Sequence, residues 1–326
     1  MRNRTTYELT TGTPVTRCSA VALLSRKPYR MREGARNGGS GWIAVTESSP
    51  VSGALDLTAT NSMVGADSRS TQYVRSLGVL VPELQPTFLA GLCEDALDAR
   101  RLTALRGYAD DNYSGEFRPE NGLEEIFELI RRPTPPGVWG DLGAGPFTAL
   151  WALCARAATE VVAVDICVEA LWLADRKWAE FLDGEFVSSL VEAGMASAGD
   201  VSRVAGLPRR YVVCDLFDRS AIRPSGQATL CTAFGLLGLA EERDQLAAGV
   251  AAARQMLVPG GAFVGASWRR RARASALFEE WPAGFCAMAR STGFSVESLV
   301  FKELPCDGIF DAVATWRFAV ANEELS

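Results

Sequence analysis

Glycines and carboxylates stand at the ends of successive apolar runs in this chain. The stretch VWGDLGAGPFTALWALC, from Val138 to Cys154, is typical of a strand, a tight turn at Gly143 and Gly145, and the start of a helix. Such a turn lets the backbone approach a ligand closely. Asp165 ends the next apolar run, and an acid there can accept both hydroxyls of a ribose. Asp215 ends the third run, which suits it to receive an adenine amino group.

Each of these features has a second explanation when it is taken alone. A dinucleotide fingerprint needs a third glycine where this chain has Thr148, so the phosphate grip is weakened. Asp165 and Asp215 could each simply cap the helix that follows. The full set, which includes the turn at Pro259–Gly261, favours one shared ligand crevice at the carboxyl ends of the strands.

The composition excludes several kinds of chemistry. The 326 residues contain no histidine, which excludes Ser-His and Cys-His nucleophile pairs and imidazole metal sites. The net charge of −6 argues against nucleic-acid binding through a strongly basic surface. The 8 cysteines are scattered without a C-x-x-C pair, so we interpret most of them as small buried hydrophobes and expect no metal site.

The chain also lacks signals for a membrane. No apolar run approaches the roughly 18 residues of a membrane span, and the apolar cluster near the N-terminus, Ala20 to Leu24, is too short for a signal-peptide core. We therefore expect a cytoplasmic protein without membrane contact.

Strands and helices are predicted to alternate after the Pro-rich break RRPTPPG. This alternation predicts an α/β fold with a mostly parallel sheet between helices. FSVESLVFKEL and FDAVATWRFAV, with no helix between them, predict a terminal antiparallel pair. The expected strands are Val138–Leu142, Val161–Asp165, Tyr211–Asp215, Ala228–Ala233 and Ala262–Ser267, and the expected helices are 148–158, 168–182, 241–257 and 274–292.

Three parts are predicted along the chain. Residues 1–70 are rich in Ser, Thr, Gly and Arg and indicate a weakly ordered extension. Residues 71–135 carry apolar residues at helical spacing and predict a helical cap. Residues 136–322 hold the alternating strands and helices of a Rossmann-like core.

The motifs DLGAGP, VVAVD, VVCDLF and MLVPGGAFV stand in the order of those of class I S-adenosylmethionine-dependent methyltransferases, and the chain resembles that family over about 108–320. It looks closest to the branch of nicotinamide and phenylethanolamine N-methyltransferases and thioether S-methyltransferase. GAGP, the insert at about 183–208 and GYADDNYSGEF support that branch. The resemblance implies a seven-stranded sheet with an antiparallel last strand.

The resemblance also implies which residues hold the methyl donor, S-adenosyl-L-methionine. A tyrosine pair closes over the cofactor in this branch, and Tyr108 and Tyr113 match it by position. Aromatic faces suit a sulfonium cation. The matched positions are Tyr108, Tyr113, Gly143, Ala144, Gly145, Pro146, Asp165, Ile166, Asp215, Leu216 and Ala233.

The acceptor side departs from that branch. Its amine enzymes carry acids after the fourth or fifth strand, where this chain has Leu237 and Ser267. Arg269 and Arg270 follow Ser267, and arginines can grip a carboxylate. Ser267, Arg269 and Arg270 are therefore predicted to bind a substrate with an anionic group, although a solvated helix start explains the arginines as well. The nearest acids in sequence are Asp110, Asp111 and Glu116.

We interpret the chain as a small-molecule methyltransferase that acts on an amine or heteroaromatic nitrogen. Methyl transfer suits a chain without histidine, since it depends mainly on holding nucleophile, methyl carbon and sulfur in line. Two alternatives stay open at this point. One is an NAD(P)-dependent oxidoreductase, disfavoured by Thr148 and by the lack of a Tyr-x-x-x-Lys pair; the other is a non-catalytic nucleoside-binding module.

Overall fold

The computed structural model describes residues 5–6, 83–84, 89, 91–117, 122–218, 226–270, 278, 281–304 and 310–321. The predicted extension over 1–70 therefore lies almost entirely outside the described residues. So does the first part of the predicted cap, and so does most of 271–280.

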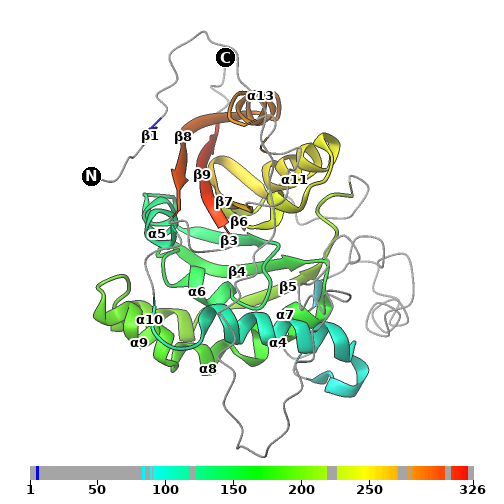
Figure 1. Ribbon diagram of the computed structural model, residues 1–326, viewed down its shortest axis with the longest axis vertical. Coiled ribbons are helices and arrows are strands. Elements are labelled where there is room, and N and C mark those ends of the chain that lie inside the picture. Colours follow the sequence, from blue (N-terminus) through cyan, green and yellow to red (C-terminus); the bar gives the residue numbers. More distant parts are fainter. Residues whose placement is uncertain are drawn as a thin grey trace, which may run out of the picture.

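One mixed sheet forms the centre of the fold (Figure 1). The strand order is β1-β8-β9-β7-β6-β3-β4-β5-β2. β3, β4, β5, β6 and β7 pair in parallel, and β9 is antiparallel to both β7 and β8. The strands are β1 (Thr5–Thr6), β2 (Glu83–Leu84), β3 (Gly137–Leu142), β4 (Ala158–Asp165), β5 (Arg209–Val213), β6 (Ala228–Phe234), β7 (Leu257–Arg270), β8 (Phe294–Glu303) and β9 (Phe310–Val320).

Seven of these strands form the predicted α/β sheet, and the antiparallel last strand is confirmed. β1 and β2 add two residues each to the outer edges, next to β8 and β5. Neither short strand was predicted: β1 lies in the segment predicted to be weakly ordered, and β2 lies in the segment predicted to be a helical cap.

Helices cover both faces of the sheet (Figure 1). One buried cluster joins α4 through α9 to one face, and a second joins α11 and α13 to the other. The helices are α4 (Ala99–Tyr113), α5 (Leu123–Arg131), α6 (Thr148–Ala152), α7 (Val168–Arg176), α8 (Trp178–Leu182), α9 (Glu185–Glu192), α10 (Ala198–Ala205), α11 (Arg243–Met256) and α13 (Ala283–Ser291), with 3₁₀ turns η1 (Glu94–Ala96) and η3 (Leu236–Leu239).

Three helix predictions were wrong in extent. The helix predicted over 148–158 ends at Ala152, and the one predicted over 168–182 breaks at Lys177 into α7 and α8. Of the helix predicted over 274–292, Phe278 is helical, Trp281 and Pro282 form a turn, and α13 begins at Ala283. Proline suits the start of a helix because it lacks the N–H that a helix interior uses.

α4 is fixed against α7, beside which it lies in Figure 1. Asp98 caps α4 by accepting the N–H groups of Arg100 and Arg101 at 2.9 and 3.1 Å. The Asp98 N–H donates in turn to Glu169 Oε1 of α7 at 3.0 Å. These bonds hold the N-terminal end of α4, while its C-terminal end carries the two tyrosines of the predicted lid.

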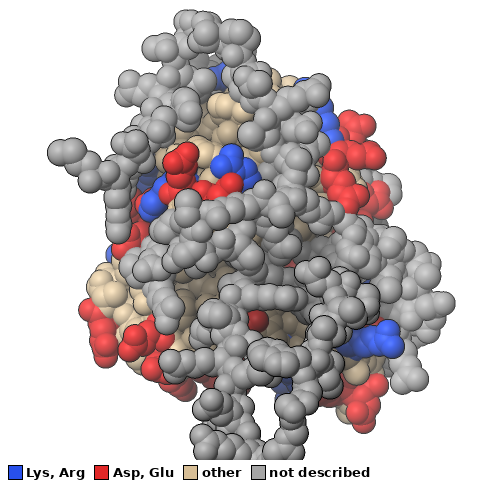
Figure 2. Space-filling model, viewed as in Figure 1, with Lys and Arg blue, Asp and Glu red and all other residues tan. Residues whose placement is uncertain are grey.

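The described surface carries the acidic character of the sequence. On the face shown in Figure 2, acidic side chains gather at the lower left, over the region where α8, α9 and α10 lie in Figure 1. Within the described ranges, no helix has both the length and the apolar character needed to cross a bilayer. Five of the six cysteines described as free thiols are buried, as predicted for small hydrophobes.

Candidate functional site

The glycine turn follows directly on β3, as predicted. Gly143 and Gly145 have positive φ angles of 66° and 56°, a conformation that favours glycine. The N–H groups of Gly143 and Ala144 both donate to the Val164 carbonyl, at 2.8 and 3.0 Å. A Cβ atom at Gly143 would lie 2.8 Å from the Cβ of Leu236, whereas one at Gly145 would meet nothing within 4 Å. The turn is thus packed at Gly143 and open at Gly145.

Asp165 holds this turn through its carboxylate. Its Oδ2 accepts the Gly145 N–H at 2.9 Å and its Oδ1 accepts the Cys167 N–H at 2.8 Å. Burial raises the pKa of Asp165, and the backbone hydrogen bonds partly oppose this. The acid predicted to bind ribose therefore also fixes the backbone at the ends of β3 and β4.

Asp141, near the end of β3, is a charged group inside the fold that we had not assigned to the site. Its carboxylate is 2% exposed and accepts the Thr232 hydroxyl at Oδ1, at 2.7 Å. Thr232 accepts in turn the indole N–H of Trp139 at 2.9 Å. The other oxygen, Oδ2, has no hydrogen-bond partner among the described residues.

The electrostatics of Asp141 follow from that burial. Loss of hydration raises the pKa of Asp141 to about 7; the hydroxyls of Thr232 and Thr148 counteract this, and the charge of Asp165 adds to it. Thr148 Oγ1 is buried close enough to this carboxylate to lower its pKa, although the contact does not have the geometry of a normal hydrogen bond in the described structure. A cationic group placed at Oδ2 would relieve the cost of burying this carboxylate.

Asp141 faces a small cavity of about 50 Å³ beside the glycine turn. The tyrosines of α4 and aromatic residues of α6 and β6 close it. Its lining residues are Tyr108, Tyr113, Asp141, Gly143, Ala144, Gly145, Pro146, Phe147, Trp151 and Phe234. Six of the predicted cofactor positions therefore meet here with four residues that sequence reasoning did not assign.

The predicted tyrosine pair lies over the turn. The ring centroids of Tyr108 and Tyr113 are 6.0 Å apart in an edge-to-face arrangement. Tyr113 lies 3.8 Å from Phe147, the residue after the turn, and Tyr108 lies 5.9 Å from it. Burial raises the pKa of Tyr108 well above its usual range and that of Tyr113 to about 12, so both rings present neutral hydroxyls.

The remaining predicted cofactor positions flank this cavity without lining it. The Cys214 N–H donates to the Asp165 carbonyl at 3.0 Å, which places Asp215 at the same sheet edge as Asp165. Asp215 Oδ1 accepts the Phe217 N–H at 2.9 Å. Leu216 and Ala233 are buried in the cluster on the α11 face, and Ile166 is a partly buried neighbour of the α4 face.

The predicted substrate residues do not meet at the cavity. Side chains alternate along a strand, and Trp268 belongs to the cluster on the α4 face while Phe263 belongs to the other. Ser267 and Arg269 therefore lie on the α11 face of β7. Arg269 Nε donates to Asp311 Oδ1 at 2.7 Å, and its guanidinium lies 5.1 Å from the ring centre of Phe301.

The other described residues predicted near the methyl acceptor lie in different parts of the fold. Leu237, where the resembled branch carries an acid, is fully buried against α11. The side chain of Arg270 lies outside the described residues, as do Arg271 and Arg273. Asp110, Asp111 and Glu116 are exposed, at or just beyond the C-terminal end of α4.

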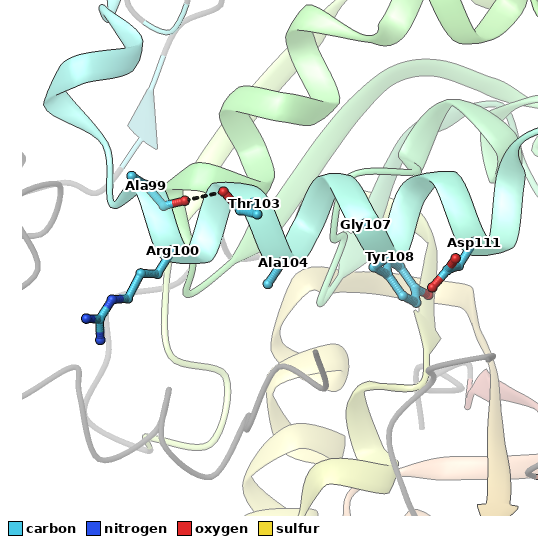
Figure 3. Close-up of a pocket in the computed structure, with 7 residues that line it drawn as sticks. All are labelled: Ala99, Arg100, Thr103, Ala104, Gly107, Tyr108 and Asp111. Atoms are coloured by element: carbon cyan, nitrogen blue, oxygen red, sulfur yellow. Dashed lines mark hydrogen bonds between the residues drawn. The ribbon is translucent and has the colours of Figure 1, made fainter. Parts of the chain in front are cut away.

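A larger cavity of about 570 Å³ runs along α4 and shares Tyr108 with the small one. Small residues form most of its described wall, together with Arg100, Tyr108 and Asp111. Figure 3 shows Tyr108 and Asp111 directed to the same side of α4. The two cavities therefore adjoin at Tyr108, one of the two lid residues.

No family model matches the chain, and no curated protein matches it. Among solved structures it is similar to the N-methyltransferase NodS from Bradyrhizobium japonicum WM9, at 12% identity over 61% of this chain and 93% of that chain, with a TM-score of 0.42. It is also similar to a SAM-dependent methyltransferase from Methanosarcina mazei, at 13% identity over 64% of this chain and 100% of that chain, with a TM-score of 0.43. A third is the 16S rRNA (adenine(1408)-N(1))-methyltransferase from Catenulisporales acidiphilia, at 14% identity over 62% of this chain and 93% of that chain, with a TM-score of 0.39. At these identities and TM-scores, function has to be argued from the site itself.

Proposed function

We propose that the chain is a small-molecule methyltransferase that uses S-adenosyl-L-methionine as the methyl donor. The observation that carries this proposal is the Oδ2 atom of Asp141, buried and without a described partner beside a positive-φ glycine turn. The ammonium of an amino acid group carried by a nucleoside has the charge that complements this carboxylate. The donor supplies a methyl group already activated on a sulfonium sulfur.

The chain's own residues fit that donor at three points. Asp141 receives the ammonium of the methionine part, which neutralises a carboxylate that is costly to bury. Gly145 leaves open space where any other residue would place a Cβ. Asp165, next to the turn, receives the ribose hydroxyls beside the backbone groups that it already accepts.

Tyr108 and Tyr113 act as a lid in this proposal. A cavity of about 50 Å³ is far below the roughly 300 Å³ or more of a typical ligand pocket, so the rings must move outward when the donor binds. Once closed, they keep water from the reacting atoms and place aromatic faces toward the cation. Residues 71–135 are the proposed cap and 136–322 the proposed catalytic core.

The acceptor is placed in the cavity along α4, which meets the small cavity at Tyr108. Donor and acceptor need adjoining compartments, because transfer requires the nucleophile and the methyl carbon in contact and in line. Asp111 lies in that wall and is the acid best placed to accept a proton from an amine. An amine or heteroaromatic nitrogen is the proposed nucleophile.

The nearer resemblance, to the nicotinamide and phenylethanolamine N-methyltransferase branch, rests on GAGP, the insert and the tyrosine pair. The proposal also includes an anionic group on the substrate, which the arginines after Ser267 suggest. Arg269 already pairs with Asp311, on the face of β7 away from the cavity.

Calorimetric titration of the purified chain with S-adenosylhomocysteine and with NAD tests the donor assignment. We expect saturable binding of S-adenosylhomocysteine and none of NAD; the reverse result would overturn the proposal. Transfer of a labelled methyl group from S-adenosyl-L-methionine to a metabolite extract then tests catalysis. Binding of the donor without any transfer would instead identify a non-catalytic nucleoside-binding module.

A further inference from the structure

A third cavity, lined by aromatic residues, lies next to Tyr113 and shares no lining residue with the cavity along α4. It has a volume of about 250 Å³ and is formed where the C-terminal end of α4 meets α8 and α9. Four aromatic residues line it: Tyr113, Phe147, Phe181 and Phe186. The proposed methyl transfer uses Tyr113 of this wall as part of the lid but places no ligand in the cavity itself, which we call the aromatic box.

Each of the four rings contacts two of the others. Ring centroids are 3.8 Å apart for Tyr113 and Phe147, 6.0 Å for Phe147 and Phe181, 6.0 Å for Phe181 and Phe186, and 5.7 Å for Phe186 and Tyr113. The four rings therefore form one continuous aromatic wall of the cavity. A cation that lies against this wall is within about 6 Å of a ring, which is the range of a cation–π interaction.

Carboxylates stand around the aromatic rings. Asp110 of α4, Glu180 of α8 and Glu185 of α9 line the same cavity, and Lys177 is the one basic residue among its described lining residues. Lys177 Nζ pairs with Glu180 Oε1 at 2.9 Å, so its charge is already balanced. Figure 2 shows acidic side chains gathered over this part of the molecule. The local field thus favours a positive ligand.

We propose that the aromatic box binds a small organic cation with an alkylated ammonium head. Apolar methyl groups would fit among the rings, whose faces attract the positive charge, and the carboxylates attract the cation from outside. A metal ion would lack the apolar contacts, and an anion would meet repulsion from the acids. The box adjoins the donor cavity, because Tyr113 and Phe147 line both cavities, with ring centroids 3.8 Å apart.

This inference does not rest on the proposed methyl transfer, and its test needs no turnover. The probe is choline chloride, titrated calorimetrically into the whole chain at constant ionic strength. The matched probe is 3,3-dimethylbutan-1-ol, which has the same shape without the charge. We expect choline to bind at least about tenfold more tightly, as cation–π contacts from several rings require. Equal affinity for the two probes, or no saturable choline binding, would overturn the proposal.

Variants locate the binding within the box. Phe181→Leu keeps an apolar side chain and removes one ring, and we expect it to weaken choline binding at least about threefold. Phe117→Leu is its control, because Phe117 lies 5.9 Å from Phe186 but does not line the cavity. Unfolding curves establish that both variants fold.

A charge variant provides an independent readout if Phe181→Leu fails to fold. Glu185→Gln should weaken choline binding and leave the neutral probe unaffected. Glu192→Gln, at the other end of α9, is the control and should change neither. If Glu185→Gln and Glu192→Gln bind choline as tightly as the unchanged chain, the acids play no part and the box is not a cation site.

Discussion

Replacing Asp141 by asparagine should make the ligand-free chain more stable while it weakens binding of the donor. Burial raises the pKa of Asp141 from 3.8 to about 7, and a displacement of this size corresponds to about 4 kcal/mol between the two protonation states. Asparagine removes the charge but leaves a buried amide that lacks a full set of partners, at a cost of about 1–3 kcal/mol. The net expectation above pH 7 is a gain of about 1–3 kcal/mol.

The pH dependence fixes the sign of this effect. The folded state keeps the proton on Asp141 up to about pH 7, whereas the unfolded chain loses it near pH 4. Because the folded state then binds more protons, this residue makes stability fall as pH rises from about 4 to 7. Asp141→Asn should lose that slope, so the variant is the more stable protein at pH 8, and toward pH 4 the order reverses, because only the amide's cost of about 1–3 kcal/mol then remains.

Donor binding should change in the opposite direction. Loss of a charge-assisted hydrogen bond costs about 1.5–3 kcal/mol, so S-adenosylhomocysteine should bind about 10- to 150-fold more weakly to Asp141→Asn. For the unchanged chain, affinity should fall as pH drops below 7, since the proton on Asp141 competes with the ligand's ammonium.

Urea unfolding from pH 4 to 8 and calorimetric titration measure the two halves of this prediction. Asp183→Asn, at an exposed turn after α8, is the control and should alter neither quantity. If Asp141→Asn binds S-adenosylhomocysteine as tightly as the unchanged chain, the ammonium does not lie at this carboxylate. If the variant shows no gain in stability at pH 8, the carboxylate is not a buried charge.

Two further predictions concern the turn. Gly143→Ala should destabilise the fold more than Gly145→Ala, because a Cβ at residue 143 would lie 2.8 Å from the Cβ of Leu236, while a Cβ at residue 145 meets nothing within 4 Å. The positive φ alone should cost each variant about 1 kcal/mol. Equal losses of unfolding free energy in urea would contradict the packing argument. Asp165→Ala should weaken S-adenosylhomocysteine binding by about 1–3 kcal/mol and also lower the free energy of unfolding, because its oxygens hold the N–H groups of Gly145 and Cys167. A loss of stability with unchanged affinity would show that this acid only supports the turn.

The sheet could be predicted from the sequence because each parallel strand is an apolar run buried on both faces. The first and last residues of the helices and strands could be predicted less well. β7 begins at Leu257, five residues before the predicted strand, so the Pro259–Gly261 turn lies inside it, at an irregularity in its pairing with β6. Local residue preferences indicate a turn there, and only the pairing with β6 shows that the strand continues through it.

The site was predicted where backbone conformation defines it and missed where side-chain packing does. Positive φ at Gly143 and Gly145 follows from residue type. Asp141 had one available signal, an acid inside an apolar strand, but its pairing with Thr232 joins residues from strands far apart in sequence. Ser267 and Arg269 were predicted from their position after a strand, and which face of β7 they occupy depends on the register with β6 and β9.

The turn and the acid beneath it contribute in different ways to a donor site. Val164 and Asp165 already fix the turn by hydrogen bonds, so its N–H groups need no rearrangement when a ligand arrives. Asp141 is not satisfied in this way, since one oxygen lacks a described partner. A rigid turn lowers the entropic cost of binding any ligand of suitable shape. An unsatisfied buried carboxylate favours a cation that can also donate a hydrogen bond. The ammonium of an amino acid group can do so and the pyridinium ring of NAD cannot, so in the proposed site selectivity for an amino-acid-bearing nucleoside over NAD would depend on Asp141 and not on the glycines.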